Sequence, residues 1–128
     1  MNKFAAEELL YQKADAAGRD AAARCKPVPM IVGTPTTPFG NDMDPAKPTY
    51  FVDGGVCGFA WVTIRPARGK FVSYLKSKGL GNVGYYGGYQ MSSRMMTQSM
   101  AVNEAYCEAF ANVLRCFGVK AHSESRID

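Results

Sequence analysis

The stretch "TYFVDGGVCGFAWVTIRP", residues 49–66, contains two runs that are rich in β-branched and aromatic residues. Asp53, Gly54 and Gly55 separate the runs, and residues of these types accept the positive φ angles of a tight turn. Both faces of the second run are apolar, with the alternating side chains Phe59, Ala60, Trp61, Val62, Thr63 and Ile64. We therefore predict a β-hairpin whose second strand lies in the interior of a sheet.

Two helices are predicted after this stretch. Pro66 precedes "ARGKFVSYLKSK", residues 67–78, in which the apolar side chains share one face and Gly79 provides a glycine cap. Residues 100–117, "MAVNEAYCEAFANVLRCF", repeat apolar side chains at helical spacing, and Ser99 or Thr97 can cap their amino end. Gly118 then ends this helix, and "VKAHSE" alternates as a final short strand.

The amino-terminal part is predicted to hold one helix and one irregular connector. Residues 3–24 favour a helix by propensity, but its apolar side consists mostly of alanine after the second turn, with Phe4, Leu9, Leu10, Ala14, Ala17 and Ala21. Such a side buries little area, so we expect loose docking or contact with a second subunit in a homodimer. Residues 27–48 hold six of the seven prolines, which leaves room only for a short edge strand near residues 30–32.

These elements predict one α+β domain over residues 1–128, with a two-layer core at residues 49–124. We expect a mostly antiparallel sheet of about four strands with the helices packed on one face. One of the strands is expected in "VGYYGGYQM", residues 83–91. Adjacent glycines weaken a strand unless a partner approaches its backbone or the strand bulges, and tyrosines beside them can stack on flat ligands. Core or edge packing of the tyrosines is the structural alternative.

The charge distribution points to an anionic partner. Between Asp53 and Glu104 there is no acidic residue, whereas this window contains the cations Arg65, Arg68, Lys70, Lys76, Lys78 and Arg94. Arg65, Arg68 and Lys70 lie where a strand ends and a helix begins, a place where free backbone N–H groups also favour anions. If Arg94 converges there, a phosphate site results, with stacking and close approach at Tyr85, Tyr86, Gly87, Gly88 and Tyr89. The alternative is that acids of the flanking segments neutralise this block.

Signals for catalysis, cofactors and metals are weak in this sequence. No P-loop or dinucleotide-binding glycine motif is present. The four cysteines, which we expect to be reduced and buried, lack the spacing of metal ligands. His122 has no evident catalytic partner, so we predict neither an enzyme nor a metal or cofactor site. We also expect a soluble intracellular protein, because no signal peptide and no apolar span of membrane-crossing length is evident.

Several segments together resemble one protein family. "CGFAWVTIRP", "YYGGY", "QSMAVNEAYCEAFANVL" and the terminal "SRID" are similar to motifs of small, largely uncharacterised proteins of tailed bacteriophages, as is the connector "KPVPMIVGTPTTPFGNDMDP". The resemblance implies a phage protein that acts in the host cytoplasm by binding host or defence components.

Taken with the charge pattern, the resemblance favours an accessory protein for host takeover or counter-defence that binds nucleic acid or a nucleotide-like ligand. One alternative is a protein-interaction module that inhibits a host or defence enzyme through exposed methionines and the first helix. A small enzyme using His122 and a virion component are further alternatives.

Overall fold

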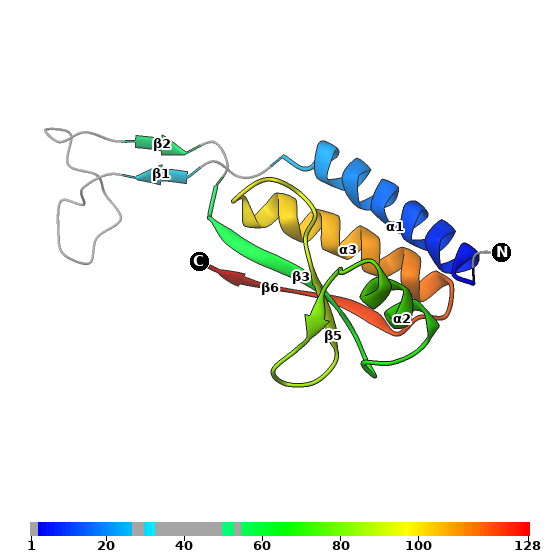
Figure 1. The fold of residues 1–128 in the computed structure, drawn as a ribbon. Coiled ribbons are helices and arrows are strands. Elements are labelled where there is room, and N and C mark those ends of the chain that lie inside the picture. Colours follow the sequence, from blue (N-terminus) through cyan, green and yellow to red (C-terminus); the bar gives the residue numbers. More distant parts are fainter. Residues whose placement is uncertain (1–2, 27–29, 33–49, 53–54) are drawn as a thin grey trace, which may run out of the picture.

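The computed structural model describes residues 3–26, 30–32, 50–52 and 55–128. Its helices are α1 (Ala5–Arg24), α2 (Lys70–Ser77) and α3 (Met100–Cys116). Its strands are β1 (Met30–Val32), β2 (Tyr50–Val52), β3 (Gly58–Ile64), β4 (Asn82–Val83), β5 (Tyr89–Ser92) and β6 (Ala121–Ile127). The helices are packed with a four-stranded antiparallel sheet in the order β4-β5-β3-β6 (Figure 1). This arrangement confirms the predicted α+β fold.

β3 lies in the interior of the sheet, as its two apolar faces predicted, but the predicted hairpin is wrong. β2 pairs with β1 in a separate two-stranded sheet, in which Met30 is opposite Val52. Both hydrogen-bonding edges of β3 are occupied, by β5 on one side and β6 on the other, so no edge is left for β2. Asp53 and Gly54 of the proposed turn lie outside the described residues. The strand expected near residues 30–32 is present, and the rest of the connector at residues 27–48 is not described.

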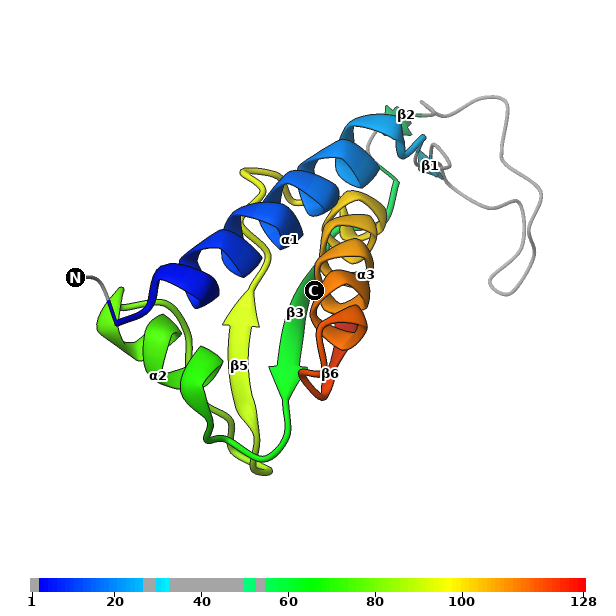
Figure 2. The same cartoon turned by 90° about the vertical axis from the view of Figure 1, so that its right-hand side faces the viewer.

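α3 covers one face of the sheet, where it contacts β3 and β6. Figure 2 shows β5 and β3 side by side, and in both views α1 runs along α3. The core between these layers consists of fully or nearly fully buried side chains, including Val62, Ile64, Val72, Leu75, Tyr106, Phe110 and Leu114. The face of the sheet that α3 covers therefore holds the apolar side chains on which the fold depends.

The predicted caps of α3 and the predicted carboxyl end of α2 are confirmed. Ser99 caps α3 by accepting a hydrogen bond from the Val102 amide. Gly118 ends that helix with a φ of 87°, and the Val119 amide donates to the Leu114 carbonyl at 3.0 Å. α2 ends in the same way at Gly79, but it begins only at Lys70, because Gly69 has a φ of 116° that is incompatible with a helix.

α1 docks closely on α3, against the expectation of loose docking. Its buried residues Ala14, Gly18 and Ala22 are spaced four apart, whereas Ala17 and Ala21 of the predicted stripe are only partly buried. A Cβ atom added at Gly18 would lie 2.6 Å from Cδ2 of Tyr106, so the two helices approach too closely for any side chain there. The Tyr106 hydroxyl donates to the Asp15 carboxylate, which adds a polar contact between these helices.

The predicted strand at residues 83–91 is wrong, because its centre is the turn between β4 and β5. The Gly84 amide donates to the Gly88 carbonyl at 2.9 Å, and Gly87 and Gly88 have φ angles of 89° and 77°. Two consecutive positive φ angles reverse the chain, which a strand cannot accommodate. Tyr85 and Tyr86 consequently lie in the turn, whereas Tyr89 is buried in β5.

The four cysteines are all free, but the expectation that all are buried is wrong. Cys107 is buried, and this burial raises the pKa of its thiol to about 12. Cys25 is partly exposed, and Cys57 and Cys116 are exposed. Within the described parts of the chain, no helix combines the length and the apolar character needed to cross a membrane.

Candidate anion-binding site

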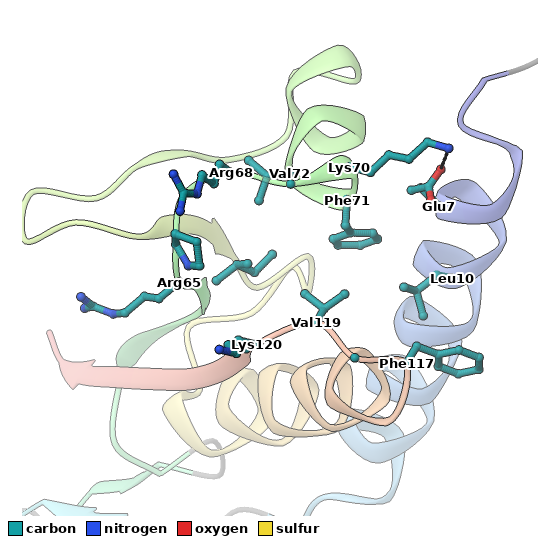
Figure 3. A pocket seen from close by; sticks show the side chains of 14 residues that line it. Glu7, Leu10, Arg65, Arg68, Lys70, Phe71, Val72, Phe117, Val119 and Lys120 are labelled. Carbon is teal, nitrogen blue, oxygen red and sulfur yellow. Dashed lines mark ion pairs between the residues drawn. The ribbon is translucent and has the colours of Figure 1, made fainter.

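Two loops meet at one end of the sheet and form a cavity. The first loop follows β3 and leads to α2, and the second joins α3 to β6. The Arg65 amide donates to the Lys120 carbonyl at 3.1 Å, which fixes the loops to one another. Between them, α2 and α1 lies a cavity of about 410 Å³ (Figure 3). Its lining thus comes from three stretches that are distant in the sequence, residues 7–10, 64–72 and 117–120.

The cavity combines an apolar wall with a cationic rim. The apolar part is lined by Leu10, Ile64, Phe71, Val72, Phe117 and Val119. Arg65, Arg68, Lys70 and Lys120 supply the positive charge, and we call these four residues the basic corner. Among the described residues that line the cavity, Glu7 is the only acid, and its Oε1 lies 3.7 Å from the Lys70 Nζ. The rim therefore keeps an excess of positive charge.

Three of the four cations predicted to bind an anion lie in the basic corner, but Arg94 does not. Ile64 pairs with Tyr89 and Trp61 pairs with Ser92, so Arg94 follows the end of β5 that is remote from Arg65. Arg94 instead lies near Tyr11 of α1. Burial raises the pKa of the Tyr11 phenol, Asp15 raises it further, and Arg94 lowers it.

The predicted stacking residues divide into two groups. Tyr85 and Tyr86 are 92% and 85% exposed, and their ring centroids lie 4.8 Å apart in an edge-to-face arrangement. Arg65 joins this turn to the basic corner, because its Nη1 donates to the Tyr86 carbonyl at 3.3 Å. Tyr89, by contrast, belongs to the core and offers no ring to a ligand.

Gly87 and Gly88, the last two of the three glycines in this turn, each have a structural reason to be there. A Cβ atom at Gly88 would lie 2.9 Å from Thr63 Cγ2 and 3.1 Å from Arg65 Cγ. Gly88 therefore lets the turn pack directly on β3. Gly87 has more space, with only Arg65 Nη1 at 3.8 Å, so its positive φ explains its presence better than steric demand does.

Sequence reasoning missed Lys120 and Arg115 at this site. Lys120 lies outside the acid-free window, and it reaches Arg65 only because β6 pairs with β3, with Ala121 opposite Ile64. Arg115 borders a second, more open hollow that it shares with Arg65 and Lys120, and its Nη1 donates to the Ala121 carbonyl at 2.8 Å. No signal in the sequence identified the strand pairing that collects these cations.

His122 has an acidic partner on the next outward-facing position of β6. Its Nε2 lies 2.7 Å from Glu124 Oε1, and Glu124 Oε2 accepts a hydrogen bond from Trp61 Nε1 at 3.0 Å. The bond to His122 is the main cause that lowers the pKa of the Glu124 carboxyl. Ser123 lies on the opposite face of the sheet, since it pairs with the buried Val62, so it is not placed beside the His122 ring.

Among the described residues, no group of three histidine, cysteine, aspartate or glutamate side chains is arranged to hold a metal ion. No family model, curated protein or solved structure matches this chain.

Proposed function

We propose that this protein acts by binding a phosphate-bearing partner, a nucleic acid or a nucleotide-like ligand, at the basic corner. The observation that carries the proposal is the set of four cationic side chains around one cavity that contains a single carboxylate. The carboxylate of Glu7 is paired with only one of the cations, Lys70. Arg68 and Lys120 can therefore attract an anion without competition from an acid in the lining, and Arg65, whose side chain points away from the cavity (Figure 3), adds its charge at the rim.

The shape and chemistry of the lining favour a ligand with both a phosphate and a flat apolar part. Arginine can bind phosphate through two parallel N–H donors, and Arg65 and Arg68 lie on the same loop. The amino end of α2, at Gly69 and Lys70, faces the same cavity and adds backbone N–H groups. Phe71 and Val119 supply an apolar wall against which a base can pack.

The biological setting of the proposal comes from the phage-like motifs rather than from the cavity. In that setting the protein is an accessory factor for host takeover or counter-defence in the cytoplasm of an infected bacterium. Its action there is binding, without a catalysed reaction. Inhibition of a host or defence enzyme by direct protein contact is the alternative, and the two predict different responses to salt.

The proposal is tested by reversing one charge at a time. We expect Arg68→Glu to weaken the binding of inorganic triphosphate at least tenfold in calorimetric titrations, because a phosphate contact becomes a repulsion. Arg94→Glu is the matched control, since it changes the net charge equally but lies at the other end of β5. It should weaken binding by less than about threefold, through long-range potential alone.

Two results would contradict the proposal. Equal losses for the two variants would mean that net charge, and not the basic corner, governs binding. Affinity that stays constant between about 50 and 200 mM salt would exclude phosphate contacts and favour the protein-contact alternative. Circular dichroism spectra of both variants should match that of the unmodified protein, because both arginines are exposed.

A further inference from the structure

The side of the sheet opposite α3 has an uncovered aromatic and charged surface. Along β3, Ala60, Val62 and Ile64 point to α3 and are buried, so Phe59 and Trp61 point to the other side. Phe59 is 48% exposed, and Trp61 is partly exposed. Among the described elements, α1 and α3 lie on one side of β3 and β6 (Figure 1), so neither of these helices covers the other side, on which Thr63 is buried while Phe59 stays exposed. We define the open sheet face as Phe59, Trp61, Ser92, His122, Glu124 and Arg126.

The two aromatic rings of this face are held by neighbours on β6. Arg126 is directly opposite Phe59, and its guanidinium carbon lies 5.4 Å from the ring centroid. Glu124 is directly opposite Trp61 and accepts the indole N–H at 3.0 Å. Rings fixed on strands lose little conformational freedom when a ligand stacks on them, so they suit recognition of flat groups.

Positive charge lies at both ends of the open sheet face. Arg126 is at one end, and Arg65 of the basic corner follows β3 at the other. In Figure 3 the Arg65 side chain points away from the cavity. The hydrogen bond from His122 is the main cause that lowers the pKa of Glu124, and the charge of Arg65 lowers it further. Glu124, the acid of this face, already binds His122 and Trp61. Cations therefore flank an aromatic centre, and Glu124, the carboxylate among the residues that define this face, is already hydrogen-bonded.

We propose that the open sheet face binds single-stranded nucleic acid, with bases stacked on Phe59 and Trp61 and phosphates at Arg126 and Arg65. The proposal rests on the proposed function and narrows it, because Arg65 makes the face continuous with the basic corner. Aromatic platforms with cationic edges bind single strands through stacking and phosphate contacts. A duplex keeps its base faces inside the stack and cannot use the two rings.

The geometry of β3 agrees with this occupant better than with a second copy of the chain. Phe59 and Trp61 are two residues apart, so their rings are separated by about 7 Å along the strand, enough for consecutive bases of an extended strand. Two copies packed face to face would instead bring the cationic ends Arg65 and Arg126 of both chains into a shared contact. Such a contact brings like charges together, and Glu124, the carboxylate among the residues that define the face, is already bound to His122 and Trp61.

Trp61 is the only tryptophan in the sequence, which gives the test a direct optical signal. A single-stranded oligonucleotide of about 12 residues should quench its fluorescence on binding, whereas inorganic triphosphate should not, because triphosphate carries no base. We expect Phe59→Ala to weaken oligonucleotide binding about fivefold or more. Triphosphate binding, which uses the basic corner, should stay unchanged in this variant.

Val83→Ala is the matched control for Phe59→Ala. Val83 is also an exposed apolar side chain on the same sheet, but it pairs with the inward-facing Tyr89 and so does not point to the open sheet face. Its replacement should leave oligonucleotide affinity and Trp61 quenching as they are in the unmodified protein. A matching duplex should compete weakly with the single strand.

Several results would overturn the inference and leave the proposed function intact. One is triphosphate binding that Arg68→Glu removes, together with oligonucleotide binding that neither quenches Trp61 nor responds to Phe59→Ala. Another is a duplex that binds as tightly as the single strand. A dimer in sedimentation measurements that Phe59→Ala dissociates would assign the face to a second copy instead. If the unmodified protein itself did not bind triphosphate, the proposed function would be contradicted as well.

Discussion

The two faces of β3 are similar in residue type and differ in what covers them. Val62 is 1% exposed beneath α3, whereas Phe59, three positions earlier on the opposite face, is 48% exposed. On the covered face, apolar side chains meet Tyr106, Phe110 and Leu114 of α3, and water is excluded. On the open face, Trp61 and Phe59 meet polar and charged side chains of β6 instead.

This difference separates stability from recognition within a single strand. Apolar area removed from water stabilises the fold, so the covered face should control the free energy of unfolding. Aromatic rings that stay in water contribute little to that free energy and are available to a partner. Substitutions on the two faces should therefore have opposite consequences for folding and for binding.

The largest effect is expected from Leu114→Ala. Leu114 of α3 is fully buried in the core, and its truncation leaves a cavity that the packed neighbours fill only in part. We expect the free energy of unfolding, from urea titrations, to fall by about 2–5 kcal/mol. Phe59→Ala, the open-face counterpart, should cost less than about 1 kcal/mol, mainly through its lost contact with Arg126. Similar costs for the two variants would contradict the division between the faces.

A smaller loss is expected from Gly18→Ala, which tests the outer layer of the covered side. The added Cβ would lie 2.6 Å from the Tyr106 ring, and that ring is held by Asp15 and by packing on Phe110. We expect the free energy of unfolding to fall by about 1–3 kcal/mol, measured by thermal or urea denaturation.

The control for Gly18→Ala is Ala16→Leu at an exposed position of the same helix, which should change stability by less than about 0.5 kcal/mol. In a helix with free space, replacing glycine by alanine stabilises by up to about 1 kcal/mol. A stabilising Gly18→Ala would thus show that α1 does not pack closely on α3.

Features that depend on local chemistry were predictable from the sequence. α3 follows from its periodic apolar residues, and its ends follow from a serine cap and from Gly118. The interior position of β3 follows from its two apolar faces. In each case the residues that decide the structure are close in sequence, so propensity and periodicity contain the relevant information.

Features that depend on long-range pairing were not predictable. The same β-rich run could pair with β2, and only the completed sheet shows that β5 and β6 occupy both edges of β3. That pairing also places Lys120 beside Arg65 and keeps Arg94 away from it. The sequence around Tyr85 and Tyr86 is compatible with either a strand or a turn. The structure has a turn there, because the two following glycines both have positive φ angles.

The smallest effect is expected at Glu124, and it distinguishes the two faces by their response to pH. Hydrogen bonds from His122 and Trp61 favour the ionised carboxylate, so its pKa in the folded protein lies below the ordinary value of 4.5. A lowered folded-state pKa contributes stability above pH 4.5, and this contribution is lost as the pH falls through the folded-state pKa. Glu124→Gln should therefore reduce the free energy of unfolding by less than about 1 kcal/mol near neutral pH, because the pair is partly exposed.

The measurement that checks this expectation is urea unfolding of the unmodified protein and Glu124→Gln across pH 3–7. The stability difference between the two should be present at the neutral end and vanish at the acidic end. The cost of Leu114→Ala should stay constant over the same range, because no ionisable group is removed from the covered face. If the Glu124→Gln difference instead grew with acid, the hydrogen bonds on the open face would favour the protonated carboxyl, and Glu124 could not be the occupied carboxylate that leaves Arg65 and Arg126 free for phosphate.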